Sequence, residues 1–191
     1  MRKHTSSITM SRTYKFANPE GIYFLSFATV GWIDVFTRRI YKDILIDSLD
    51  FCLKNKGLRL FGYVIMSNHL HLIAKAQDGF ELSGIIRDFK KFTSKQIIKA
   101  IEENPVESRS KWMLSIFKKA GQYNSNNKFY QFWQQDNHPI ELYTKEVIDQ
   151  KIEYIHNNPV KEGYVSNAED YLYSSARNYT GLDHLIEIEL I

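Results

Sequence analysis

The feature that most restricts the fold of this chain is a pair of apolar, aromatic-rich runs separated by only two residues. Residues 58–66 and 69–76 each have the composition and length of a β-strand, and the polar residues Ser67 and Asn68 lie between them. Parallel neighbours need a crossover of about a dozen residues or more, so two strands this close together can only pair antiparallel. The spacing therefore excludes an all-parallel, doubly wound sheet.

Further strand and helix patterns flank this pair. Residues 22–29 are rich in aromatic and other strand-favouring side chains. Apolar residues recur at helical spacing in 38–56, 82–101 and 144–158, and Thr144 suits the N-cap of the last segment. The order is strand, helix, strand, strand, helix, loop, helix. The simplest arrangement is an α+β fold, a ferredoxin-like antiparallel sheet with helices packed on one face.

The length of 191 residues is sufficient for one domain with its own core. We divide the chain into a polar, mobile N-terminal segment (1–20), a folded domain (21–181) and an acidic C-terminal tail (182–191). Within the domain, we interpret the polar and basic residues 102–128 as an insertion or loop, with a short helix expected at 112–119. The tail either folds back over the basic surface or is a solvated end.

Composition excludes several classes of protein. The single cysteine, Cys52, excludes an internal disulfide framework and a cysteine-cage zinc site. No apolar run approaches the roughly 20 residues that span a bilayer, and residues 1–18 lack the apolar core of a secretory signal. We therefore expect a soluble, cytoplasmic protein without a membrane partner.

The net charge of +3 hides an uneven distribution. Residues 87–128 hold ten Lys and Arg against four acids, a local charge of +6. Residues 162–191 hold six acids against one Arg, a local charge of −5. A basic stretch of this kind can attract phosphate, although charge alone fits a solvated helix face equally well.

The two histidines of the second strand in the central pair are candidates for a metal site. Side chains at i and i+2 of a strand point to the same face, so His69 and His71 project together while Leu70 and Leu72 enter the core. Two neutral imidazoles on one face form half of a metal site. The alternative is a pair of surface histidines.

The end of the 144–158 segment holds a second candidate. Tyr154 and Asn158 are four residues apart, so a helix that ends before Pro159 places them on one face, one turn apart. The alternative is a packing tyrosine and an asparagine that caps the helix. His156 does not fit this face, and we expect it at the surface.

The aromatic residues of 129–135 suit stacking on unpaired bases or, alternatively, a core strand. The chain contains neither a Gly-x-x-x-x-Gly-Lys phosphate loop nor a Gly-x-Gly-x-x-Gly fingerprint, and no Gly-x-Ser-x-Gly nucleophile elbow. Nucleotide-binding and serine-hydrolase readings of the common types therefore have no support.

Together these motifs resemble those of the single-tyrosine HUH transposases (IS200-like), and within them the REP-associated tyrosine transposase-like branch. The resemblance rests on the Met-Ser-Asn-His-Leu-His run at 66–71 and the Tyr-x-x-x-Asn-Pro-Val-Lys-x-Gly run at 154–163. The pair Phe132 and Trp133, about twenty residues before the tyrosine, adds to it. The resemblance covers roughly residues 20–180.

This resemblance implies a ferredoxin-like enzyme that cleaves and joins single-stranded or hairpin DNA. It assigns Tyr154 as the nucleophile that forms a 5′-phosphotyrosine intermediate. It assigns His69, His71 and Asn158 as ligands of a divalent metal, Mg²⁺ or Mn²⁺. The protein would act as a monomer or as a homodimer that exchanges the tyrosine helix.

Candidate DNA contacts follow from residue type. Four basic residues of the +6 segment are candidates for phosphate contacts, and one aromatic residue is a candidate for base stacking: Arg87, Lys90, Lys91, Lys95 and Trp133. Two other functions remain open from the sequence. One is a domesticated DNA-binding protein without strand transfer, and the other is a metal-dependent nuclease that uses activated water.

Overall fold

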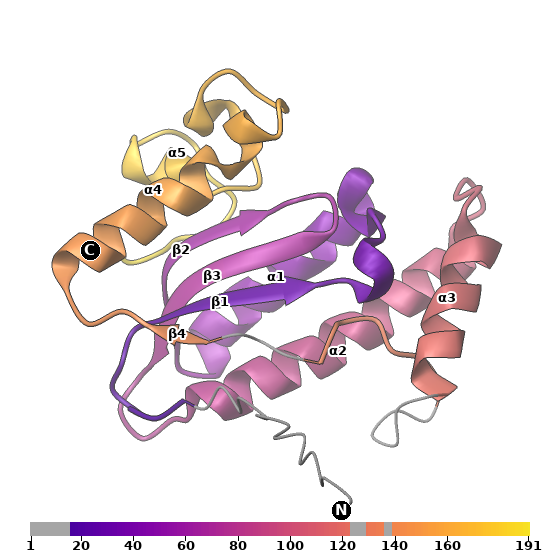
Figure 1. The fold of residues 1–191 in the computed structure, drawn as a ribbon, viewed down its shortest axis with the longest axis horizontal. Coiled ribbons are helices and arrows are strands. Elements are labelled where there is room, and N and C mark those ends of the chain that lie inside the picture. Colours follow the sequence, from indigo (N-terminus) through magenta and orange to yellow (C-terminus); the bar gives the residue numbers. More distant parts are fainter. Residues whose placement is uncertain (1–15, 123–128, 136–138) are drawn as a thin grey trace, which may run out of the picture.

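A computed structural model describes residues 16–122, 129–135 and 139–191. The sheet has four strands in the order β2-β3-β1-β4, and each neighbouring pair is antiparallel (Figure 1). The strands are β1 (Tyr23–Ala28), β2 (Leu58–Ile65), β3 (His69–Ala76) and β4 (Ile140–Glu141). This arrangement confirms the predicted antiparallel α+β fold. Of the segment 1–20, which we predicted to be mobile, residues 1–15 lie outside the described residues.

The short connection between β2 and β3 forms a tight hairpin, as its spacing predicts. The backbone N–H of Met66 donates to the carbonyl of His69 over 2.8 Å, which closes the turn. Leu72 pairs with Leu25 on one side and with Tyr63 on the other, so β3 is the central strand of the pairing.

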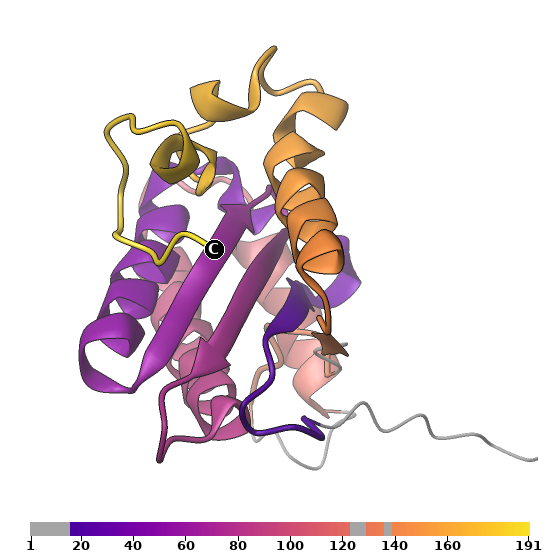
Figure 2. The same cartoon turned by 90° about the vertical axis from the view of Figure 1, so that its left-hand side faces the viewer.

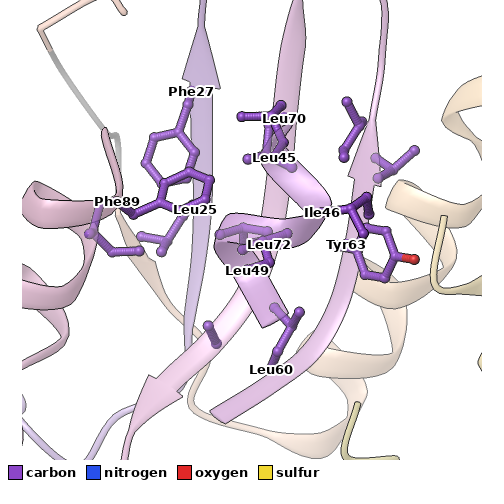
Figure 3. Packing of buried hydrophobic residues seen from close by; sticks show 14 of the residues in the cluster. Leu25, Phe27, Leu45, Ile46, Leu49, Leu60, Tyr63, Leu70, Leu72 and Phe89 are labelled. Atoms are coloured by element: carbon purple, nitrogen blue, oxygen red, sulfur yellow. The ribbon is translucent and has the colours of Figure 1, made fainter. Parts of the chain in front are cut away.

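Two long helices cover one face of the sheet. They are α1 (Arg39–Asn55) and α2 (Leu82–Glu103), and both place an apolar stripe against the strands. Figure 3 shows Leu45 and Leu49 of α1 and Phe89 of α2 beside strand residues such as Leu25 and Leu72. These strand side chains are fully buried and form the core of the domain.

A third long helix, α4 (Lys145–Lys161), packs on the opposite face of the sheet (Figures 1 and 2). Gly62 of β2 allows this close approach, because a Cβ atom there would lie within 3 Å of side-chain carbons of Ile152 and Ile155. Thr144 caps the helix as predicted, accepting a hydrogen bond from Val147 N–H. The helix continues through Pro159, so its predicted end at residue 158 is too early. The predicted packing of helices on one face of the sheet is therefore correct for α1 and α2, whereas α4 forms a layer on the other face.

The segment 102–128, predicted as an insertion or loop with a short helix at 112–119, contains a longer helix at that place, α3 (Ser110–Gln122). Buried Glu107, just before α3, binds Arg109 over 3.1 Å and Arg38 over 2.6 Å. Burial alone would raise the pKa of Glu107, but the hydrogen bonds from the two arginines outweigh burial and lower the pKa to about 2. This ionic cluster ties the start of α3 to the start of α1. Residues 123–128, the remainder of the predicted insertion, lie outside the described residues.

The acidic C-terminal tail lies along the outer edge of β2. The backbone N–H of Glu189 donates to the carbonyl of Leu60 over 2.9 Å, and its carboxylate pairs with Arg59. Asn178 donates to the carbonyl of Ile186, whose side chain is buried. The tail is therefore part of the folded domain and protects an edge strand.

Short helices complete the described chain. They are the 3₁₀ turns η1 (Val30–Trp32), η2 (Val35–Thr37) and η3 (Ala168–Asp170), and helix α5 (Ala176–Tyr179). Over the ranges that the structure describes, no helix has both the length and the apolar character needed to cross a membrane.

Candidate active site

The alternation of β3 places both histidines on the face that α4 covers. Leu70 and Leu72 are fully buried on the other face, within the core. The imidazole centroids of His69 and His71 lie 4.7 Å apart with an interplanar angle of 65°. The predicted pairing of the two rings on one face is therefore present in the structure.

The surroundings of both imidazoles lower their pKa values and so favour the neutral forms. Burial lowers the pKa of His71 to about 3, and repulsion from His69 and Lys151 adds to this effect. Burial also lowers the pKa of His69, although Glu162 opposes the shift. Neutral imidazoles have a lone pair available, and this is the form in which histidine binds metal ions.

Asn68 orients His69. Its side-chain N–H donates to the carbonyl of Trp32 over 3.3 Å, so its Oδ1 faces the Nδ1 atom of His69 at 2.7 Å. Because Oδ1 is only an acceptor, Nδ1 carries the proton, and the lone pair of His69 resides on Nε2. A hydrogen bond from one ring nitrogen to a neighbouring oxygen in this way fixes the tautomer of a histidine and the direction of its lone pair.

Helix α4 places Tyr154 directly beside the histidine pair. The ring centroid of Tyr154 lies 5.6 Å from that of His71 and 6.0 Å from that of Phe24. The residue is 40% exposed, so the phenol has access to solvent. The tyrosine and the histidines thus come together within one chain.

Two lysines of α4 flank the tyrosine. The Nζ atom of Lys151 lies 5.3 Å from the Tyr154 ring centroid, and that of Lys161 lies 5.6 Å from it. Sequence reasoning did not identify these residues as candidates. The available signal was their spacing of three residues before and seven residues after Tyr154, which places all three on one side of a helix.

Two polar atoms of the site are buried without a hydrogen-bond partner. They are Nδ1 of His71 and Nδ2 of Asn158, a residue that is only 8% exposed. Buried polar atoms without partners are rare and need an explanation. A divalent ion can bind the lone pair of an unpartnered imidazole nitrogen, whereas the amide N–H group of Asn158 is a donor that a cation does not satisfy. Asn158 would instead offer its amide oxygen, and two imidazoles with one amide oxygen form a donor set that fits Mn²⁺ or Mg²⁺. No cluster of three or more His, Cys, Asp or Glu side chains occurs in the described ranges, so a third protein ligand would come from a group such as this amide.

The structure corrects the predicted stacking residue. Trp133 is only 4% exposed, its indole N–H donates to Thr93, and its ring stacks on Phe36 at 5.7 Å. The ring is enclosed on the core side, which leaves no free face for a base. The core-strand alternative for this aromatic segment is the correct one for Trp133 and for Phe132, which is also buried.

The predicted phosphate contacts lie away from the histidine pair. Arg87, Lys91 and Lys95 are exposed on α2, and the sheet separates that helix from the histidines and α4 (Figure 2). Lys90 is partly buried and donates to the carbonyl of Gln134 over 2.9 Å. The structure therefore does not bring these four residues to the candidate site.

His156, which we expected at the surface, is partly buried instead. Its Nε2 lies 2.9 Å from the hydroxyl of Ser175, and burial lowers its pKa to about 4. It faces the C-terminal region of the chain, where its ring centroid lies 5.1 Å from that of Tyr179.

Comparisons with known proteins agree with this fold. Residues 27–120 match the family described as "Transposase IS200 like". The chain therefore carries an IS200-like transposase domain, which confirms the resemblance found in the sequence. The matched residues include His69 and His71 but end before Tyr154.

One solved structure extends the comparison to the whole fold. A REP-associated tyrosine transposase bound to a REP hairpin is similar with a TM-score of 0.63 and 16% identity, over 94% of this chain and 92% of that chain. A putative transposase from Deinococcus radiodurans R1 matches at 19% identity with a TM-score of 0.41, over 82% of this chain and 97% of that one. No curated protein matches the sequence.

Proposed function

We propose that this chain cleaves and rejoins single-stranded or hairpin DNA by attack of Tyr154 on a backbone phosphate. One observation carries the proposal: the Tyr154 ring lies 5.6 Å from His71 of the histidine pair within the same chain. The nucleophile and the candidate phosphate-activating site are thus adjacent without help from another subunit.

His69, His71 and Asn158 would hold the divalent ion, Mg²⁺ or Mn²⁺. When bound there, such an ion polarises the scissile phosphate and stabilises the charge that develops on its oxygens. Asn68 would keep the Nε2 lone pair of His69 directed at the ion. The lowered pKa values of the two imidazoles favour their neutral forms, each with one ring nitrogen whose lone pair is available.

The tyrosine performs the covalent step. A phenol with a reference pKa of about 10 is a weak nucleophile at neutral pH, so it needs positive charge nearby. Lys151 and Lys161 place positive charge beside the Tyr154 ring, where it attracts the incoming phosphate. The Oη–phosphorus bond forms as the bond from phosphorus to the 3′ oxygen breaks. The protein then holds a 5′ phosphate, and the released 3′ oxygen takes up a proton.

This chemistry conserves the energy of the broken bond. A 3′-hydroxyl can attack the phosphotyrosine and restore a phosphodiester, which makes joining independent of ATP. A water-activating nuclease would instead release a free 5′ phosphate, and it would not need a tyrosine beside the histidine pair.

DNA with a hairpin is the substrate that the comparisons favour, because the similar solved structure contains a REP hairpin. The proximity of Tyr154 and His71 favours a monomer in which each chain is a complete active site.

The test is incubation of the protein with a hairpin oligonucleotide bearing single-stranded flanks and Mg²⁺ or Mn²⁺, followed by a denaturing gel. We expect a covalent protein–DNA band that disappears in Tyr154→Phe. The matched control is Tyr164→Phe, because Tyr164 is also exposed but stacks on Tyr171 instead. A band that persists in Tyr154→Phe contradicts the nucleophile assignment. DNA binding without any band in the unaltered protein supports the DNA-binding alternative.

A further inference from the structure

The turn after β1 holds an exposed tryptophan in an unfavourable backbone conformation. Gly31 has φ of 66° and Trp32 has φ of 54°, two consecutive residues in the left-handed region. Among the residues that the structure describes, Trp32 is the only non-glycine residue with a positive φ. Bulky residues rarely adopt this conformation, and such outliers concentrate at functional sites.

Hydrogen bonds from both sides hold this turn in place. The backbone N–H of Trp32 donates to the carbonyl of Thr29 over 3.0 Å, and the side chain of Asn68 donates to the carbonyl of Trp32 over 3.3 Å. The buried hydroxyl of Thr29 also contacts the carbonyl of Ile33 at 2.7 Å. Asn68 is the residue that orients His69, so the position of Trp32 is linked directly to the histidine pair.

The indole ring lies at the rim of the site. Its centroid is 6.1 Å from that of His69 with an interplanar angle of 72°, so the two rings meet edge to face. The residue is nevertheless 57% exposed. The indole is thus held beside the histidines without being buried, in contrast to Trp133 in the core.

We infer that Trp32 is a stacking platform for an unpaired DNA base next to the phosphate that the histidine pair would hold. The inference rests on the proposed function, and it identifies a base-binding position within the same site. A phosphate near His69 carries a nucleoside on each side, and the exposed Trp32 ring beside His69 offers an aromatic surface to one of the two bases. Stacking on an indole tolerates any base, so Trp32 would hold the strand at the site without reading its sequence.

The first experiment measures binding with the fluorescence of Trp32 itself. The chain has three tryptophans, so Trp112→Phe leaves Trp32 as the exposed emitter, with Trp133 buried. We expect a hairpin oligonucleotide with single-stranded flanks to quench this emission in a Tyr154→Phe background, where no adduct forms. In Trp32→Phe/Trp112→Phe the quenching should disappear. Quenching of equal size without Trp32 overturns the inference.

The second experiment measures affinity. We expect Trp32→Ala to raise the Kd for this DNA roughly 5- to 100-fold, the range found for loss of one stacked base. Phe92→Ala is the matched control, because Phe92 is equally exposed but lies on α2, across the sheet. Trp32→Asn should weaken binding to the same extent and still fold, since asparagine tolerates a positive φ. Unchanged affinity in a folded Trp32→Asn protein overturns the inference.

The third experiment locates the base and separates this inference from the proposed function. Single abasic positions are introduced along the flanks, and Kd is measured with Trp32 and with Ala at that position. We expect one abasic position to weaken binding to the unaltered protein and to have little effect on Trp32→Ala. Equal losses in both proteins at every position contradict stacking by Trp32. This measurement of Kd does not depend on cleavage. Absence of a phosphotyrosine adduct would therefore refute the proposed function, whereas stacking by Trp32 is decided by how abasic positions change the Kd of the two proteins.

Discussion

On the face of the sheet beneath α1 and α2, buried apolar side chains pack on one another and the Tyr63 hydroxyl is buried without a partner. The face beneath α4 carries two histidines, and two buried nitrogens without partners lie on that side, in His71 and Asn158. Leu70 and Leu72 point to the first face, and His69 and His71 of the same strand point to the second. The first face satisfies the requirements of folding. The second retains buried polar atoms and a strained turn, features that reduce stability and that a bound ligand could compensate. Adjacent residues of one strand therefore serve different purposes.

The sharpest test compares two neighbouring residues of β3. We expect His71→Ala to reduce formation of the covalent adduct by more than about 100-fold, since it removes one of the proposed metal ligands. Its melting temperature should change little, because the substitution also removes a buried nitrogen without a partner. Leu72→Ala should instead destabilise the fold by about 2–5 kcal/mol through the cavity it creates. Adduct gels and thermal unfolding measured on both variants decide the point, and equal melting temperatures would contradict the contrast between the faces.

The α4 face also predicts how mixed subunits behave. His71→Ala and Tyr154→Phe each lack one half of the site, and the two halves lie within one chain. An equimolar mixture of the two variants should therefore form no more adduct than the separate proteins. Subunits that exchange α4 would pair the intact tyrosine of one chain with the intact histidines of the other. Recovery of the adduct on mixing would thus contradict a site completed within one chain.

Much of the α4 face was predictable from local periodicity. The alternation of residues 69–76 predicts two histidines on one face, and the spacing of Tyr154 and Asn158 predicts one side of a helix. Neither pattern specifies that this helix covers the histidines. That depends on tertiary contacts, such as the close approach that Gly62 permits.

The wrong predictions, for Trp133 and for the basic residues of α2, also arose because tertiary contacts cannot be read from local sequence patterns. Trp133 belongs to an aromatic segment that suits both stacking and core packing, and only its neighbours Phe36 and Thr93 distinguish the two. The basic residues of α2 were linked to the site by charge alone, which does not reveal the face of the sheet that a helix covers. Trp32 lies in a short turn without periodicity, and its conformation was not evident from residue type.

On the α1 and α2 side of the sheet, we expect a substitution that lowers the free energy of unfolding without changing adduct formation. Glu107→Gln removes the carboxylate that binds Arg38 and Arg109, and we expect a loss of about 2 kcal/mol at pH 7. The folded-state pKa of this carboxyl is about 2, below its ordinary value of 4.5, so its stabilisation is present above pH 4.5 and is lost as pH falls toward 2. Chemical denaturation at several pH values should show the two proteins converging in acid. Adduct formation per folded molecule should stay unchanged, and a specific loss there would link the ionic cluster to the active site.

The smallest effect concerns charge on the two sides of the sheet. Lys161→Gln removes a cation 5.6 Å from the Tyr154 ring, and we expect DNA affinity to fall a few-fold. If Lys161 contacts a phosphate, the slope of log K against log salt should decrease by about 0.7, the value for one contact with a single strand. Lys95→Gln, on exposed α2, makes the same change in net charge across the sheet and should leave both quantities nearly unaltered. Because the two variants have the same net charge, a difference in their DNA affinity or salt dependence shows which side of the sheet the DNA contacts. A larger effect from Lys95→Gln would place the DNA on the α2 side and reverse the assignment of the two faces.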